Sequence, residues 1–183
     1  MIFTETKLKG CFIIEPKIIN DERGYFMESF NEKTFQNGVG SEVHFVQDNQ
    51  SFSSKGVLRG LHYQTGVHAQ AKLVRVIHGE VLDVAVDIRP DSETFGQYEA
   101  ILLSAENQKQ FFIPRGFAHG FLVVSETATF FYKCDNFYNK ESEGGIKFDA
   151  PEINIDWQFD SESLIISEKD QNLPTLANSK KVW

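Results

Sequence analysis

The chain has 183 residues, 41% of them hydrophobic, which suits one domain with a substantial core, and we predict a single domain over residues 1–183. Its net charge of −8 argues against nucleic-acid binding, which needs a basic face. The sequence lacks both a signal peptide and an apolar run of about 18 residues, which predicts a cytoplasmic protein without membrane contact. Its two cysteines, Cys11 and Cys134, are too few for a disulfide framework and are predicted to be core thiols.

Short apolar runs separated by Gly, Pro and Asn follow one another along most of the chain. Many strands at this spacing favour an all-β sandwich or barrel, and the 17 Phe residues supply the large side chains that such a core uses. Predicted strands lie within residues 10–16, 24–30, 43–52, 56–64, 72–90, 98–104, 109–114, 119–126 and 128–138. Within 72–90 the alternation continues on both sides of residues 78–80, which we interpret as a hairpin. Short helical turns are predicted near 31–35 and 151–157.

After about residue 139 the alternation fades into a polar C-terminal tail. The tail is too rich in apolar side chains for a disordered segment. We therefore predict that it packs against the sandwich as a collar, with these anchors: Phe148, Ile155, Trp157, Leu164, Ile165 and Ile166.

The segment VLRGLHYQ, residues 57–64, places Arg59 and His62 inside a run that otherwise resembles a buried strand. In a regular strand these two side chains point to opposite faces. A bulge at Gly60 would bring both toward one cavity. The alternative is that Arg59 pairs with a carboxylate outside while His62 forms a hydrogen bond in the core, and the spacing alone leaves the two equal.

Two further polar residues share a strand face with apolar neighbours. Lys72 has the parity of Val74 and Val76, so it either extends from the strand end or points at a ligand. Tyr132 has the parity of Phe130, and its hydroxyl is either satisfied in the core or available for chemistry. If both share a cavity with His62, the set is a base, a cation and a phenol, which core packing does not require.

The segment IPRGFAHGF, residues 113–121, resembles the second conserved motif of the cupin superfamily. Metal-binding cupins place His-x-His in their first motif, whereas here Gln64 follows His62 at that spacing. A tight metal site needs more ligands of the nitrogen, sulfur or carboxylate type, so we expect no metal. His119 is then either a ligand contact or a partner for a buried carbonyl. The other three histidines, His44, His68 and His78, are expected to be surface or structural residues.

Four long segments carry a closer resemblance, at residues 56–64, 71–96, 103–134 and 164–170. They are similar, in order, to the signature segments of the dTDP-sugar epimerase family. The resemblance implies a cupin-like jelly roll that works as a homodimer without metal or cofactor. The implied reaction inverts C3 and C5 of dTDP-4-dehydro-6-deoxy-D-glucose to give dTDP-4-dehydro-L-rhamnose, in dTDP-L-rhamnose biosynthesis.

The resemblance also implies a role for each matching residue. His62 is the base, Tyr132 the acid on the opposite side, Lys72 the cation at the ketone oxygen, and Asp170 the carboxylate that orients the base. Arg23 and Arg59 match a diphosphate clamp, and part of the segment 23–28 is expected to reach the partner subunit's site. Substrate contacts are implied for Phe26, Glu28, Gln47, Asn49, His119, Tyr138, Glu143 and Lys169.

Departures from the family pattern occur at Ala71, Arg115 and Gly144, and the last is expected to loosen a diphosphate contact. Three alternatives stay open. A 3-epimerase acting on a related sugar would keep most of these residues, a non-catalytic cupin would bind a sugar or nucleotide, and a metal-dependent cupin would contain a stoichiometric metal.

Overall fold

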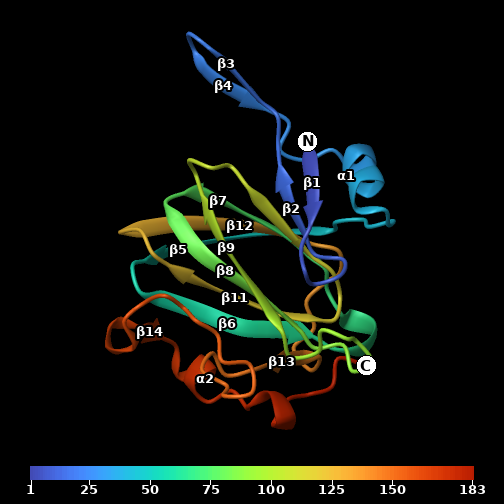
Figure 1. The fold of residues 1–183 in the computed structure, drawn as a ribbon, viewed down its shortest axis with the longest axis vertical. Coiled ribbons are helices and arrows are strands. Elements are labelled where there is room, and N and C mark those ends of the chain that lie inside the picture. Colours follow the sequence, from blue (N-terminus) through green and yellow to red (C-terminus); the bar gives the residue numbers. More distant parts are fainter.

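Two antiparallel β-sheets face each other in the computed structural model, which describes residues 1–183 (Figure 1). The first sheet has the strand order β1-β2-β10-β7-β12-β5, where the strands are β1 (Ile2–Glu5), β2 (Phe12–Glu15), β10 (Gln110–Ile113), β7 (Lys72–His78), β12 (Thr127–Cys134) and β5 (Gln47–Ser54). The second sheet has the order β13-β6-β11-β8-β9, where the strands are β13 (Glu143–Gly145), β6 (Val57–Gln64), β11 (Phe117–Val123), β8 (Glu80–Asp87) and β9 (Tyr98–Ser104). The two-residue strand β14 (Ile165–Ile166) pairs with β6 in parallel. This cupin-like sandwich confirms the predicted all-β class.

Strands β7 and β8 correct the predicted hairpin at residues 78–80. β7 pairs with β10 and β12, whereas β8 pairs with β9 and β11, so the chain passes from one sheet to the other at Gly79. Two strands that line the same core alternate in the same way whether they are neighbours or face each other. The sequence pattern could not distinguish these cases.

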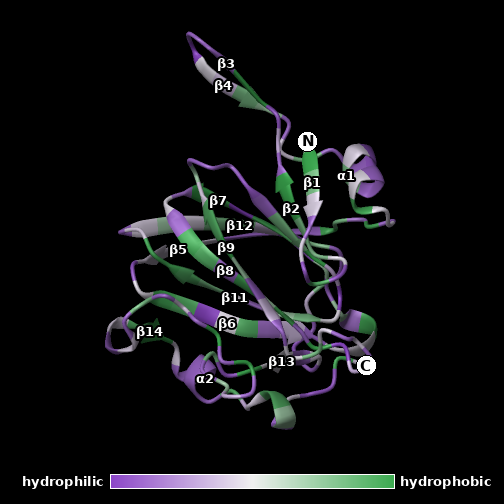
Figure 2. Cartoon of the chain, in the orientation of Figure 1, coloured by the Kyte–Doolittle hydropathy of each residue, from purple (hydrophilic) through white to green (hydrophobic).

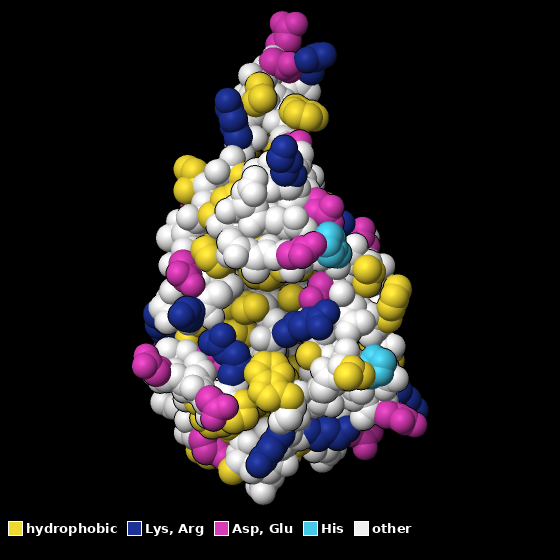
Figure 3. Space-filling view, turned by 90° about the vertical axis from the view of Figure 1, so that its right-hand side faces the viewer, with side chains coloured by type: hydrophobic (Ala, Val, Ile, Leu, Met, Phe, Trp, Pro, Cys, Tyr) yellow, Lys and Arg dark blue, Asp and Glu magenta, His cyan; other side chains and the backbone are white.

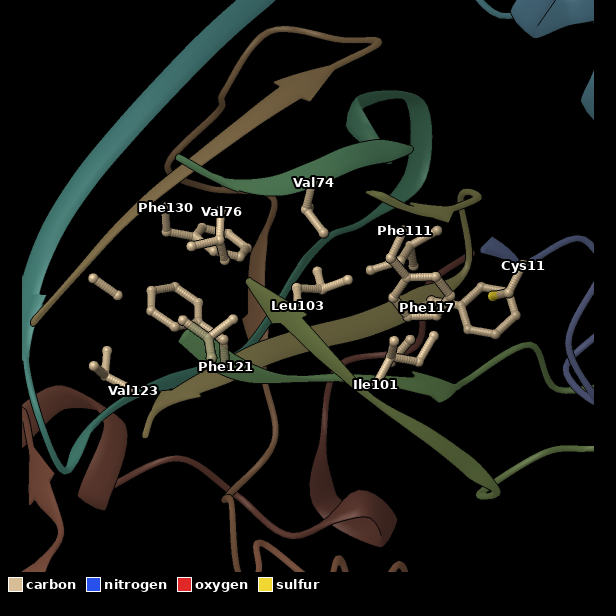
Figure 4. Packing of buried hydrophobic residues seen from close by; sticks show 14 of the residues in the cluster. Cys11, Val74, Val76, Ile101, Leu103, Phe111, Phe117, Phe121, Val123 and Phe130 are labelled. Atoms are coloured by element: carbon tan, nitrogen blue, oxygen red, sulfur yellow. The ribbon is translucent and has the colours of Figure 1, made fainter. Parts of the chain in front are cut away.

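Large apolar side chains fill the space between the two sheets. Phe111, Phe117, Phe121 and Phe130 lie there in Figure 4, together with the free, buried Cys11. The rings of Phe121 and Phe130 are stacked, with centroids 4.1 Å apart. Aromatic pairs of this kind bury much apolar surface and hold the two sheets in register with each other.

The C-terminal tail covers the outer face of the second sheet, as predicted. Trp157 packs in the same cluster as Leu82 and Val84 of β8, and its indole N–H donates to the carbonyl of Phe148 at 3.0 Å. This cover explains why β8 is buried on both faces. One predicted anchor is wrong: Ile165 is 55% exposed, because the parallel pairing of β14 turns its side chain away from the tail cluster.

Helices are few and short. α1 (Glu32–Val39) begins at Asn31, whose side chain accepts from the N–H of Thr34, and buries Phe35 against the first sheet. The predicted turn near 31–35 is confirmed as its start.

No helix forms at 151–157, where Asn154 has a φ of 53° that is incompatible with helix. α2 (Glu168–Gln171) lies further on, and short 3₁₀ turns occur at 66–68, 161–163 and 176–178. None of these helices has the length and apolar character that a membrane crossing requires.

A separate two-stranded hairpin extends away from the sandwich, as Figure 1 shows at its top. It consists of β3 (Ile18–Asp21) and β4 (Gly24–Met27). Its tip is hydrophilic in Figure 2, and Figure 3 shows charged side chains at the tip with hydrophobic ones below. Its two strands pair with each other and with no strand of the sandwich.

Candidate active site

A cavity with a volume of about 670 Å³ opens between the two sheets. We call it the main cavity. Both sheets and the tail contribute to its walls, and the predicted site residues among its lining are Asn49, Arg59, His62, Lys72, His119, Tyr132, Lys169 and Asp170. A side cavity of about 360 Å³ shares Asn49, His62, Lys72 and Tyr132 with it. These four side chains therefore lie at the junction of the two cavities.

A bulge in β6 brings Arg59 and His62 to the same wall. His62 pairs with His119 of β11, whereas Arg59 pairs with Phe121, so β6 has one residue more than β11 across this interval. The predicted bulge at Gly60 is confirmed. Gly60 has a φ of 129°, and a Cβ atom there would lie 2.6 Å from the Cα of Gly120, so only glycine fits.

His62 forms a pair with Asp170. The imidazole Nε2 lies 2.7 Å from Oδ1 of Asp170, while Oδ2 accepts from the backbone N–H of Gly60 at 3.1 Å. Burial raises the pKa of the Asp170 carboxyl, but the bonds and charge of His62 and the Gly60 N–H outweigh it and hold the net pKa below its usual value. An ionised carboxylate at Nε2 fixes the N–H there and leaves Nδ1 to take a proton.

Asp170 reaches this position because of the helix around it. Ser167 caps α2, its hydroxyl accepting from the N–H of Asp170 at 3.1 Å. The preceding β14 pairs with β6, which brings the tail across the edge of the cavity. A residue that resembles a solvated loop acid in the sequence is thus only 4% exposed.

Tyr132 and Lys72 lie on the opposite wall from His62. They belong to the neighbouring strands β12 and β7 of the first sheet, whereas His62 belongs to the second. Burial raises the pKa of the Tyr132 phenol and lowers the pKa of the Lys72 ammonium. Neither side chain forms a hydrogen bond or an ion pair within the chain, so both are free to meet a ligand.

Arg59 also lacks a carboxylate partner, which removes the alternative that it pairs outside the cavity. Its guanidinium Nε donates to the hydroxyl of Ser53 on β5 at 3.2 Å. Ser53 is one residue that sequence reasoning missed. The sequence did contain a signal for Ser53, because it lies one residue before the end of β5 and shares a strand face with Asn49.

His119 is bound to a second residue that sequence reasoning missed. Its Nε2 lies 2.9 and 3.1 Å from the two carboxylate oxygens of Asp83, and both residues are buried. The expected alternative, a buried carbonyl partner for His119, is wrong. The available signal was an aspartate at the centre of the apolar run in β8, because a buried charge needs a specific partner.

The predicted substrate contacts that lie neither in the main cavity nor on or next to the β3–β4 hairpin line the side cavity. Gln47, Tyr138 and Glu143 line it, together with Gln64, Gln70 and Cys134. Glu143 forms an ion pair with Lys169 at 2.6 Å, and the hydroxyl of Tyr138 donates to Glu143 at 3.3 Å. This pair joins β13 to α2 where the two cavities meet.

Three predicted contacts do not reach either cavity within the chain. Arg23 and Phe26 lie on the β3–β4 hairpin, and Glu28 follows it. Arg23 forms an ion pair with Asp21 and has a side chain that is 84% exposed, while Phe26 is 68% exposed. Their assignment to a partner subunit's site remains a prediction.

The other histidines lie outside both cavities, as expected, although His44 contacts Glu32 and Glu42. Gln64, in place of a metal ligand, accepts from the N–H of Asn139 at 2.9 Å. No three His, Cys, Asp or Glu side chains are grouped for a metal ion. Arg115 pairs with Asp135 away from the cavities.

Gly144 also lies outside both cavities. It faces the ring of Tyr63, which a Cβ atom would approach to 2.5 Å. The packing of this ring explains a glycine at this position.

Comparisons with known proteins identify the family of this chain. The sequence profile of the dTDP-4-dehydrorhamnose 3,5-epimerase family matches residues 5–178. The dTDP-4-dehydrorhamnose 3,5-epimerase of Methanothermobacter thermautotrophicus is 55% identical over 171 residues, covering 93% of this chain and 91% of that protein. The enzyme of the same name from Escherichia coli is 54% identical over 171 residues, covering 93% and 92%.

Solved structures give the same result. The crystal structure of the enzyme of this name from Elizabethkingia anophelis superposes with a TM-score of 0.94 at 58% identity, covering 99% of this chain and 98% of that one. The epimerase from Legionella pneumophila, solved in complex with dTDP-4-keto-L-rhamnose, has a TM-score of 0.92 at 50% identity, covering 96% and 93%. This chain therefore belongs to the dTDP-4-dehydrorhamnose 3,5-epimerase family.

Proposed function

We propose that this protein, as one epimerase domain, converts dTDP-4-dehydro-6-deoxy-D-glucose to dTDP-4-dehydro-L-rhamnose in dTDP-L-rhamnose biosynthesis. One observation carries the proposal: His62 and Tyr132 face the same cavity from opposite sheets. A sugar ring held between the sheets would meet a base on one face and an acid on the other. Inversion of a carbon next to a ketone requires this arrangement, because the proton leaves one face and returns to the other.

The first step is removal of a proton. Nδ1 of His62 takes the proton from the carbon next to the ketone, and the electrons of the broken C–H bond form a C=C bond as the ketone oxygen becomes an enolate. The Lys72 ammonium supplies a positive charge for that oxygen. A positioned base accelerates such a step by about 10²–10⁴-fold, and one oxyanion donor contributes about 10²–10³-fold.

The second step returns a proton to the opposite face. The Tyr132 hydroxyl donates to the same carbon, the C=C bond is lost and the ketone re-forms. The raised pKa of Tyr132 keeps the phenol protonated until that moment. Proton exchange with water then restores His62 and Tyr132, and the same pair can act on the second carbon, so no cofactor or metal is needed.

Cations at the cavity match the diphosphate of the substrate. Arg59 and Lys169 line the main cavity of a chain whose net charge is −8. The guanidinium of Arg59 has the geometry to bind phosphate oxygens through two N–H groups. Tyr138 of the side cavity offers an exposed aromatic face for thymine or sugar.

We also propose that two copies assemble and that the hairpin of one completes the cavity of the other. The hairpin exposes Ile19, Tyr25 and Phe26, all more than half exposed, together with Arg23. Arg23 and Phe26 are residues that one chain fails to bring to its own site. The free, buried thiols fit the reducing conditions of the cytoplasm, where we place the protein.

Complementation tests this assembly. We expect Arg23→Ala and His62→Ala each to be inactive alone. Co-expressed, they form mixed dimers in which one site has both native residues, so about a quarter of wild-type activity returns. No recovery in a mixture shown to exchange subunits would mean that each site lies within one chain.

Deuterium exchange tests the reaction itself. Incubation of the protein with dTDP-4-dehydro-6-deoxy-D-glucose in D₂O should label both C3 and C5, read by NMR of the product. Label at C3 alone would replace the double inversion by a 3-epimerase. That second candidate has specific support, since a 3′-monoepimerase from Streptomyces bikiniensis superposes with a TM-score of 0.88 at 34% identity.

Two other classes make opposite predictions. A non-catalytic binding protein would catalyse no exchange at all and would be indifferent to Tyr132→Phe, which we expect to abolish turnover while dTDP still binds. A metal-dependent cupin would lose activity on treatment with a chelator and contain stoichiometric iron, zinc or manganese. We expect neither result.

A further inference from the structure

Asp83 is a buried carboxylate that the proposed reaction does not yet use. It lies on the inner face of β8 between Val81 and Ala85 of the core, and none of its surface is exposed. Its two oxygens accept from His119, and no Lys or Arg comes within 4.0 Å of it. Burial of an anion is costly unless the surroundings compensate its charge. The question is therefore which group compensates the charge of Asp83.

The pair with Asp83 determines which nitrogen of His119 faces the cavity. Nε2 must carry the hydrogen in order to donate to the two carboxylate oxygens. Nδ1 then has a lone pair and forms no hydrogen bond within the chain. Because no buried side-chain nitrogen or oxygen lacks a partner, Nδ1 is open to the main cavity that His119 lines. Its lone pair can accept a hydrogen bond from a ligand in that cavity.

Burial keeps this imidazole neutral, and the ring of Phe130 packs beside it. Burial lowers the pKa of His119 more than the charge of Asp83 raises it. The ring of Phe130 lies nearly parallel to the imidazole, at an angle of 20° and a centroid distance of 6.0 Å. His119 is therefore not the group that compensates the charge of Asp83.

Lys72 is the cation that remains. The groups whose charges act on it are Cys134 on β12, Asp83 on β8 and Glu143 on β13, with the imidazoles of His119 and His62 and the phenol of Tyr132 lining the same cavity. Burial raises the pKa of the Cys134 thiol, so the thiol is neutral, and Glu143 is already bound to Lys169. Asp83 is thus the one fully buried carboxylate whose charge is left for Lys72.

We propose that Asp83 is a positioning residue for the epimerase reaction, one that acts through two neighbours without touching the substrate. It fixes His119 as a hydrogen-bond acceptor for a sugar hydroxyl, and its negative charge favours the ammonium form of Lys72, which stabilises the enolate. The inference rests on the proposed function for its chemistry and on the His119–Asp83 geometry for its placement.

Asp83→Asn tests the role in turnover, because it keeps the shape of the side chain and removes the charge. Lys72 should lose its proton more easily, so the alkaline limb of kcat/KM should move down by about one pH unit. The amide can also donate to Nε2 of His119 and reverse the tautomer, which should raise KM about tenfold. An alkaline limb at the wild-type pH would overturn the link to Lys72.

Asp87→Asn is the matched control. Asp87 lies on the same strand and face and is equally buried, but it is bound to Arg89, Ser92 and Thr94 outside the cavity. We expect its loss to lower the melting temperature and to leave the alkaline limb unchanged. An equal shift of the limb in both variants would mean that Asp83 acts only through the stability of β8.

The tautomer of His119 can be measured in the wild-type protein, even if Asp83→Asn does not fold. NMR of ¹⁵N-labelled histidine should show Nε2 protonated and Nδ1 unprotonated at neutral pH. A hydrogen on Nδ1, or an imidazolium at neutral pH, would overturn the proposal. This measurement needs no turnover, so it can fail or succeed independently of the epimerase activity.

Discussion

Both imidazoles that line the main cavity are paired with a carboxylate, and the two pairs share a geometry but differ in their surroundings. His62 contacts Asp170 at 2.7 Å, and His119 contacts Asp83 at 2.9 Å, through Nε2 in both cases. The side chain of His62 is 32% exposed, however, whereas that of His119 is 7% exposed. A base must become an imidazolium during the reaction, and that charge is tolerated where water and an ionised carboxylate are both at hand.

The carboxylates differ as much as the imidazoles. Asp170 comes from the tail, 108 residues from His62, and is fixed by the Gly60 N–H as well. Asp83 lies on the strand next to His119, inside the core, with His119 as its only hydrogen-bond partner through the side chain. Both imidazoles are paired with a carboxylate, so pairing does not distinguish them. The difference in burial does: the partly exposed His62 can exchange protons, whereas the buried His119 keeps its hydrogen on Nε2.

The largest effect should come from removing the exposed imidazole. His62→Ala should lower kcat by about 10²–10⁴-fold and leave dTDP affinity nearly unchanged, because the base acts in the chemical step. His119→Ala should instead act mainly on KM. The exposed His78, bound only to Thr127, gives the control His78→Ala. A His119→Ala variant that loses as much kcat as His62→Ala would erase the distinction between the pairs.

Removing the charge of Asp170, the partner of His62, should have a smaller effect than removing His62 itself. Asp170→Asn leaves the base in place and disturbs its orientation and tautomer, so kcat should fall about 10²-fold. Steady-state kinetics beside a dTDP binding measurement would separate this from lost affinity. Wild-type kcat in this variant would show that His62 needs no orienting carboxylate.

The alkaline limb of the wild-type pH profile should report Lys72. Burial lowers the pKa of Lys72, so its proton is lost at a lower pH than that of an ordinary lysine, whereas burial raises the pKa of Tyr132 and delays loss of the phenol proton. Activity that needs the ammonium is present below the lowered pKa and is lost above it. Lys72→Arg should extend any remaining activity to higher pH, because guanidinium stays protonated. A limb that does not move in this variant would assign it to another group.

The smallest predicted effect on kinetics comes from a residue that belongs to neither imidazole–carboxylate pair. Ser53→Ala removes the acceptor of Arg59 Nε, a single hydrogen bond at 3.2 Å. We expect KM to rise about two- to tenfold with kcat nearly unchanged, because the guanidinium loses orientation and keeps its charge. A comparison of dTDP with thymidine binding would check this, since thymidine has no diphosphate for Arg59 and should show no change.

Several features of the site could be predicted from sequence because they depend on local pattern. Strand parity placed Lys72 with Val74 and Tyr132 with Phe130, and both strands have these faces turned inward. The conflict between Arg59 and His62 identified the bulge at Gly60, which the pairing with β11 confirms. The resemblance supplied Asp170, whose sequence context alone gives no reason to expect a buried carboxylate.

Other features depended on contacts between distant segments. Alternation at residues 72–90 predicted two strands correctly but could not show that they lie in different sheets. The partners of Arg59 and His119 could not be predicted, since Ser53 and Asp83 belong to other strands and meet them only in the folded protein.

The all-β class, the inward faces of the strands and the residue types of an acid–base reaction can all be read from the amino-acid order, because side-chain alternation is a local property of the chain. The opposition of base and acid across two sheets, and the exposure of one imidazole beside the burial of the other, require the folded protein. Those properties arise from the packing of segments that are remote in sequence, and the proposed chemistry depends on them.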